Sequence, residues 1–149
     1  MLKLHHDMIT YNTLGVGKHI VSIFDGDAQA EVAKHKEYNS LPKGFLPIPS
    51  IEKYLYKKCI SEYDSVFIKQ INDKYFSIRS LKDIIDDYNN DSRTKTGKDK
   101  DGKAFYKVIT SNLEKAGITE SSFITYLCDD ICSYEDISKF VNSMKKLLC

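Results

Sequence analysis

The feature that most constrains the fold is a change of hydrophobic period near residue 60. Before it, short β-branched and apolar runs at 9–14, 19–24 and 45–49 alternate with turns, as strands do. The run at 19–24 is almost continuously apolar, which is typical of a strand covered on both faces. Residues 28–38 lie between the second and third runs and have helical spacing. A strand, helix, strand order predicts a small parallel α/β layer.

After this change the pattern is helical almost throughout. A helix is predicted to start after a capping Ser50, with Ile51, Leu55 and Ile60 as its apolar stripe. Further helices are predicted at 64–75, 80–88, 103–116, 119–131 and 134–148. The predicted fold class is therefore α/β, with a small parallel sheet and a predominantly helical C-terminal region. We expect a single domain over 1–149, with an α/β core at 8–60 and helices over 61–149.

Composition limits the cellular setting and the partners. The formal net charge is +1, which excludes a globally basic nucleic-acid binder but allows local basic patches. Apolar stretches are well short of the roughly 18 residues that a membrane span needs, so no membrane association is expected. The first residues lack the pattern of a secretory signal, and the four cysteines lack the density of a disulfide scaffold. Free thiols in a reducing cytoplasm are the prediction.

One segment, 89–102, contains no apolar residue and is predicted to be a solvated, mobile loop. Extended to residue 107, it holds six basic residues against three acidic ones. The basic residues are Arg93, Lys95, Lys98, Lys100, Lys103 and Lys107. They are candidate contacts for a nucleic-acid phosphate backbone. A solvated linker whose charges only maintain solubility is the alternative.

The sharpest chemical feature is Asp25-Gly26-Asp27 at the end of the second apolar run. Two carboxylates separated by one residue on an extended strand end project to the same side and favour a hard divalent cation between them. A common β-turn is the alternative. Glu52, in the first turn of the helix after the third run, adds a third carboxylate to the same sheet edge if the two strands are adjacent and parallel. Its alternative role is to stabilise the helix dipole.

These residues carry a family resemblance. The segments Phe24-Asp25-Gly26-Asp27 and Phe45-Leu46-Pro47-Ile48-Pro49-Ser50-Ile51-Glu52, with a helix between them, resemble the TOPRIM domain of OLD-family (overcoming lysogenisation defect) nucleases. The likeness covers about residues 8–60, and the helical remainder is similar only in layout. This family includes nuclease subunits of bacterial anti-phage defence systems.

The resemblance implies DNA cleavage assisted by two divalent ions, Mg²⁺ or Mn²⁺. Asp25, Asp27 and Glu52 would be catalytic metal ligands. A downstream lysine would stabilise charge on the phosphoryl group. Lys103 is the best match for that lysine, with Lys100 and Lys107 as competitors.

The sequence departs from the family at its start. TOPRIM domains begin with a strand that ends in a glutamate, but only 24 residues precede Asp25 and none is a glutamate. The run at 9–14 corresponds to the family's second strand, and the usual ATPase domain is missing. Three explanations stay open: the chain is a fragment, a partner (an ATPase domain, another chain or a second copy in a homo-oligomer) supplies the missing parts, or the domain no longer cleaves.

Two other function classes compete with the nuclease. A catalytically incomplete TOPRIM-like module that binds or assembles with a partner is the first. A haloacid-dehalogenase-like phosphotransferase is the second, with Asp25 as nucleophile, Asp27 as general acid and Asp86-Asp87 as the late acidic pair. It fits less well, because Gln29 stands where that family has threonine or valine and the late pair lies inside a predicted helix.

Overall fold

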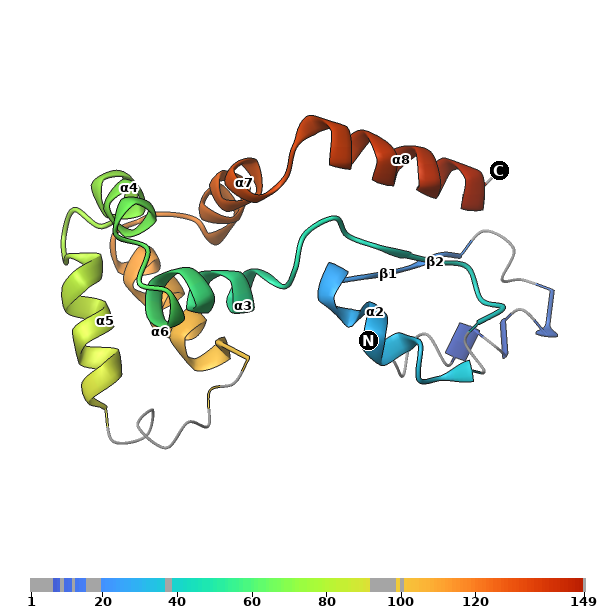
Figure 1. The fold of residues 1–149 in the computed structure, drawn as a ribbon, viewed down its shortest axis with the longest axis horizontal. Coiled ribbons are helices and arrows are strands. Elements are labelled where there is room, and N and C mark those ends of the chain that lie inside the picture. Colours follow the sequence, from blue (N-terminus) through green and yellow to red (C-terminus); the bar gives the residue numbers. More distant parts are fainter. Residues whose placement is uncertain are drawn as a thin grey trace. The chain divides into compact units, whose positions relative to one another are not determined.

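The computed structural model describes residues 7–8, 10–11, 13–15, 20–36, 39–91, 99 and 101–148. The chain divides into two compact units, which are coloured along the sequence in Figure 1. Unit 1 comprises Met1–Ser50 and Asp129–Cys149, and unit 2 comprises Ile51–Cys128. That the two units belong to one domain stays a prediction.

Unit 1 contains a two-stranded parallel sheet, as the order of elements predicts. Strand β1 (Ser22–Phe24) pairs with β2 (Lys43–Phe45), and Phe24 is opposite Phe45 in the register. The two phenylalanine rings stack with their centroids 5.8 Å apart. The 3₁₀ helix η1 (Gly26–Ala28) and the short helix α2 (Gln29–Val32) connect the strands. The chain is thus a mixed α/β protein that is mostly helical.

The prediction of a strand at 9–14 is wrong. The described residues there, together with Asp7 and Met8, are helical up to Thr13. The Leu14 N–H donates to the Thr10 carbonyl at 3.0 Å, so the backbone is satisfied locally. β-branched side chains favour strands through packing on neighbouring strands, and the described sheet offers no such neighbour to this segment.

The other two strands and the first helix are shorter than predicted. Ile20 and Val21 are not in a strand, and Ile23 is 44% exposed, so β1 is not covered on both faces. β2 begins at Lys43, two residues before the predicted run at 45–49, and ends at Phe45. The helix predicted over 28–38 is regular only as far as Val32, which is its buried residue. Helix α8 (Tyr134–Leu148) completes unit 1 and lies against β2, where Met144 meets Gly44.

Unit 2 is helical, and its elements agree closely with the predicted ones. They are α3 (Ile51–Tyr56), the π-helical turn η3 (Lys57–Ser61), α4 (Ser65–Tyr75), α5 (Leu81–Asn90), α6 (Lys103–Lys115) and most of α7 (Glu120–Ile131). No helix in the described part of the chain has the length and apolar character to cross a bilayer.

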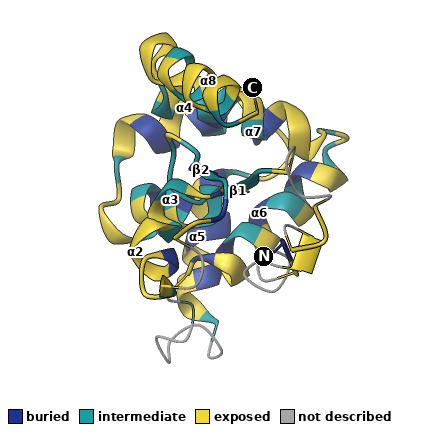
Figure 2. Cartoon of the chain, turned by 90° about the vertical axis from the view of Figure 1, so that its right-hand side faces the viewer, coloured by how far each residue is buried: buried dark blue, intermediate teal, exposed yellow. Residues whose placement is uncertain are grey.

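The apolar stripes of these helices form the core of unit 2. Figure 2 shows buried positions beside exposed ones along α4, α5 and α6. The apolar residues of α5 at helical spacing are all buried: Leu81, Ile84, Ile85 and Tyr88. Val66 of α4 and Val108 of α6 are apolar as well but are exposed. Cys59 is fully buried where the prediction favoured Ile60, and burial raises the pKa of its thiol to about 12.

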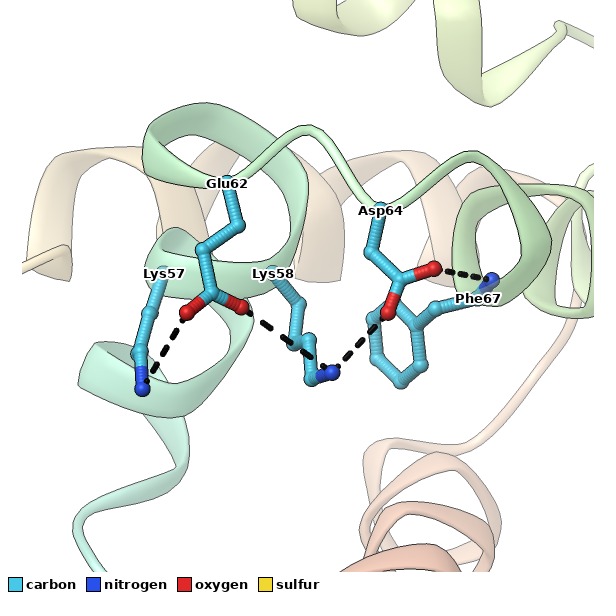
Figure 3. Close-up of polar contacts among 5 residues, drawn as sticks. All are labelled: Lys57, Lys58, Glu62, Asp64 and Phe67. Atoms are coloured by element: carbon cyan, nitrogen blue, oxygen red, sulfur yellow. Dashed lines mark hydrogen bonds and ion pairs between the residues drawn. The ribbon is translucent and has the colours of Figure 1, made fainter.

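A charged network holds the turn between α3 and α4 (Figure 3). Lys58 Nζ lies 2.9 Å from Asp64 Oδ2 and 4.0 Å from Glu62 Oε2. Asp64 also accepts a 3.1 Å hydrogen bond from the Phe67 N–H and so caps α4. Tyr63, between the two acids, has a φ of 48°, an unusual conformation for a side chain of its size. The network therefore fixes a strained turn.

Cys59 is buried, Cys128 and Cys132 are half-buried, and none of the three forms a disulfide with another described residue.

Candidate metal and phosphate sites

Asp25 and Asp27 lie at the carboxyl end of β1, and both are exposed. Asp25 is extended, with φ −59° and ψ 147°, and its carbonyl accepts a 3.0 Å hydrogen bond from the Ala28 N–H. Asp27 is already inside the 3₁₀ helix η1. Side chains two residues apart project to the same side only where both residues are extended, and here only Asp25 is. The predicted same-side arrangement of the two carboxylates is therefore wrong.

The strand end is tied to the segment that follows β2. The Gly26 N–H donates to the Ile48 carbonyl at 2.8 Å, and the Ser50 N–H donates to Asp27 Oδ1 at 3.2 Å. A Cβ on Gly26 would lie 2.5 Å from the Leu46 carbonyl oxygen. Gly26 is therefore needed because η1 runs directly against 46–48. The carboxylate of Asp27 and the chain leading to α3 share this edge of the sheet.

Glu52 lies in the first turn of α3, as predicted, and is half-buried in unit 2. Its carbonyl oxygen would lie 2.5 Å from a Cβ on Gly102, so the start of α6 passes directly over it. Its charge is also felt by Tyr106 of α6. Burial, a 2.6 Å hydrogen bond to Glu120 and the charges of Glu120 and Glu52 raise the pKa of Tyr106.

No group of three or more histidine, cysteine, aspartate or glutamate side chains within the described ranges is arranged to hold a metal ion. Asp25 and Asp27 belong to unit 1, and Glu52 belongs to unit 2. That these three carboxylates bind the same cation stays a prediction.

A groove of about 830 Å³ lies between α5 and α6, entirely within unit 2. Lys103, the predicted catalytic lysine, and Lys107, a predicted phosphate contact, both line it. Ser111 and Lys115, further along α6, also line it and were not predicted. Their spacing of four residues from Lys103 onward is the sequence signal that could have found them. The other predicted phosphate contacts, Arg93, Lys95, Lys98 and Lys100, fall outside the described residues.

Asp99 has a structural role that the sequence did not reveal. The segment 89–102 was predicted to be a solvated loop, but Asn89 and Asn90 belong to α5, and Asp99 anchors the start of α6. Its carboxylate accepts hydrogen bonds from the Tyr88 hydroxyl at 2.6 Å and from the Ala104 and Phe105 N–H groups at 3.0 and 2.9 Å. Burial raises the pKa of Asp99, but these hydrogen bonds outweigh it, and the net shift is downward.

Comparison of the chain with protein-family models, curated proteins and solved structures finds no match. The TOPRIM resemblance accordingly stays a prediction.

Proposed function

We propose that this chain is a TOPRIM-like domain of a divalent-metal-dependent DNA endonuclease, with Asp25 and Asp27 as metal ligands at the end of β1. The observation that supports it most is the parallel pair β1–β2, whose carboxyl ends bring Asp27 and Ser50 into hydrogen-bond contact. Ligands of α/β proteins bind at this edge of a parallel sheet. An exposed aspartate pair at that position suits Mg²⁺ or Mn²⁺, which prefer oxygen ligands.

Glu52, in the first turn of α3, is the proposed third ligand because the TOPRIM resemblance implies it. A divalent ion there would polarise a phosphodiester and lower the pKa of the attacking water. The uncompensated repulsion of nearby carboxylates would make metal binding favourable.

Lys103 is the proposed lysine beside the scissile phosphate. It is the first residue of α6, and its side chain is exposed on the groove. An ammonium group that contacts the phosphoryl oxygens would stabilise the charge that develops on them during cleavage. Its position next to Gly102, which packs on Glu52, supports the assignment over Lys107.

Calorimetric titration with Mn²⁺ tests the metal site. The native chain should bind the ion, and Asp25→Ala with Asp27→Ala should abolish the binding. The matched control is Asp86→Ala with Asp129→Ala, which removes the same charge from two exposed positions and should bind as the native chain does. Equal weak binding by all three proteins would overturn the metal site.

A variant of the proposed lysine tests catalysis. Lys103→Ala should lower the rate of plasmid or oligonucleotide cleavage about 100-fold, the usual effect of removing one group that stabilises transition-state charge. Its Mn²⁺ affinity should be unchanged, because the side chain contacts the phosphate and not the ion. Full cleavage by this variant would show that the lysine is wrongly assigned.

A second candidate function is a TOPRIM-like binding module that does not cleave. One observation favours it. The run at 9–14 was predicted to be the family's second strand, but its described residues are helical, and the described sheet has two strands. Mn²⁺ binding without cleavage of any DNA substrate would support this candidate over the nuclease.

A further inference from the structure

Helix α8 has two neighbouring apolar stripes, and only one of them is packed. Phe140 and Met144 belong to the packed stripe and lie against Gly44 of β2. No residue of α8 is buried, and Figure 2 shows the helix exposed or half-buried along its whole length. The other stripe, the exposed stripe, consists of Tyr134, Ile137, Val141 and Leu148. The exposed fractions of these four residues lie between 41% and 86%.

The exposed stripe has the spacing of a seam between two helices. Ile137 follows Tyr134 by three residues, and Val141 follows Ile137 by four. Leu148 comes seven residues later, so all four positions fall within an arc of about 60° on the helix. Scattered apolar side chains are ordinary on a protein surface, but a seam with heptad spacing is what a second helix packs on. The exposed stripe therefore suits a helical partner.

The layer that α8 forms on the sheet is also incomplete. Ile23 of β1 is opposite Gly44 of β2 in the register, and side chains opposite each other on adjacent strands project to the same face. Ile23 thus projects to the face that Met144 covers at Gly44, yet it is 44% exposed. The exposed stripe lies about a quarter of a turn around α8 from the packed stripe. A helix on the exposed stripe would therefore lie beside α8, in the same layer.

The exposed stripe is symmetric about its centre. Tyr134 and Leu148 are the first and last residues of α8, and each is seven residues from Val141. If a second copy of α8 packs antiparallel about a two-fold axis at Val141, the two stripes overlap over their full length. Tyr134 of each copy is then opposite Leu148 of the other, and Val141 is opposite itself. A two-fold interface requires this kind of self-complementary surface.

The charges at the two ends of α8 favour the antiparallel arrangement. The first turn is acidic, with Glu135 and Asp136, and the last turn is basic, with Lys145 and Lys146. Antiparallel copies place each acidic turn beside a basic one, whereas parallel copies would place like charges together. Glu135 and Lys145 lie on the same flank of the exposed stripe, and across the two-fold axis they are offset by only about 3 Å along the helices.

These two side chains are available for a contact between copies. No ion pair joins Lys145 to another residue of the described ranges. Glu135 pairs with Lys139 at 2.7 Å, but both side chains are largely exposed, and an exposed pair of this kind contributes little. Asp136 accepts a hydrogen bond from the Ser133 hydroxyl at 2.6 Å, so Glu135 is the acid that can exchange partners.

We propose that α8 is a self-association surface, on which two copies of this chain pair antiparallel about Val141, with Glu135 of each copy facing Lys145 of the other. Because α8 is already ordered on β2, association does not have to fold the helix. One pair of 15-residue helices makes a small interface, so the dimer should form in a concentration-dependent way. This association is independent of the proposed function.

Analytical ultracentrifugation of the full chain, from about 1 to 300 µM, tests the association over the range expected of a small interface. The native chain should shift from monomer to dimer as its concentration rises. Val141→Lys places two ammonium groups against each other at the two-fold axis and should weaken the dimer at least tenfold. Because Val141 is exposed, circular dichroism of this variant should match that of the native chain.

A charge exchange tests the direction of pairing. Glu135→Lys and Lys145→Glu should each weaken the dimer by a few fold, and the two changes together should restore it, because the pair forms again with its signs exchanged. Such a rescue cannot come from a change in folding. Lys146→Glu is the matched control, because it makes the same charge change in the same helical turn. It lies about 140° around the helix from Val141, so this variant should associate as the native chain does.

Three results would overturn the proposal. A chain that stays monomeric at every concentration would show that the stripe is covered by something other than a second copy. A dimer that Val141→Lys leaves intact would place the interface elsewhere. Single charge changes that have no more effect than Lys146→Glu would exclude the antiparallel arrangement. None of these results depends on Mn²⁺ or DNA, so they leave the nuclease proposal untouched.

Discussion

Gly102 controls how closely α6 approaches α3, and Gly102→Ala should destabilise unit 2 strongly. Its φ is +70°, a left-handed conformation that a side chain disfavours. A Cβ there would also lie 2.5 Å from the Glu52 carbonyl oxygen and 2.6 Å from the Tyr56 Cβ. Both atoms belong to the rigid part of α3, so neither can move aside without shifting the helix.

The magnitude follows from two separate terms. The left-handed conformation costs an alanine about 1 kcal/mol. Relief of the overlap by a shift of backbone adds about 1–3 kcal/mol, as in other overpacked sites. Alanine also restricts the unfolded chain, which returns about 0.5 kcal/mol. The expected loss of unfolding free energy is therefore about 1.5–3.5 kcal/mol.

Gly117→Ala is the matched control, because it measures the cost of the left-handed backbone conformation without any steric overlap. Gly117 ends α6 with nearly the same φ, +72°, but a Cβ there would meet no atom within 4 Å. Gly117→Ala should therefore lose only about 0.5 kcal/mol in urea denaturation followed by circular dichroism, because the backbone cost of about 1 kcal/mol is partly offset by the restricted unfolded chain. Equal losses for the two variants would refute the close packing of α6 on α3.

Two further predictions concern anchoring residues of unit 2. The lowered pKa of Asp99 means that its stabilising effect is complete above about pH 4 and is lost as the pH falls through the folded-state value. Asp99→Asn should therefore cost about 1 kcal/mol at pH 7, with the difference from the native chain shrinking in acid denaturation curves. Tyr63 has a φ of 48°, which glycine tolerates better than alanine does. In thermal unfolding, Tyr63→Gly should therefore be about 0.5–1 kcal/mol more stable than Tyr63→Ala. Equal stability of these two variants would contradict the strain at Tyr63.

The helical part of the fold was predictable because its signals are local. Ser80 and Asp64 accept the capping hydrogen bonds of α5 and α4, and Gly117 ends α6 in a left-handed conformation. Each of these residues acts within one helical turn of its own position. Their effects can therefore be derived from neighbouring residues alone.

The α/β part was harder because strands depend on partners that are distant in the sequence. The run at 9–14 has the composition of a strand, yet its described residues are helical. Asp25 and Asp27 were located correctly at the end of β1, but their geometry was not, because η1 begins at Gly26. That early start depends on the hydrogen bond from Gly26 to Ile48, a contact that no local pattern encodes.

The same distinction explains what was missed on α6. Lys103 was chosen from the family resemblance and Lys107 from its place at the end of a basic segment, and both criteria follow the linear sequence. Ser111 and Lys115 are equally part of the groove, because residues four apart share a helix face. Asp99 was counted as a solvated charge, although its hydrogen bonds to Tyr88 and the helix start occupy it.

The proposed metal ligands Asp25 and Asp27 and the proposed catalytic lysine Lys103 occur in different units, so their contributions should be separable by mutation. Cleavage would need both, since the metal would activate the water and the lysine would stabilise charge on the phosphoryl group. Asp25→Ala with Asp27→Ala should abolish Mn²⁺ binding and cleavage together, whereas Lys103→Ala should lower cleavage and leave Mn²⁺ binding intact. Cleavage that survives the loss of Mn²⁺ binding would refute the metal-dependent nuclease.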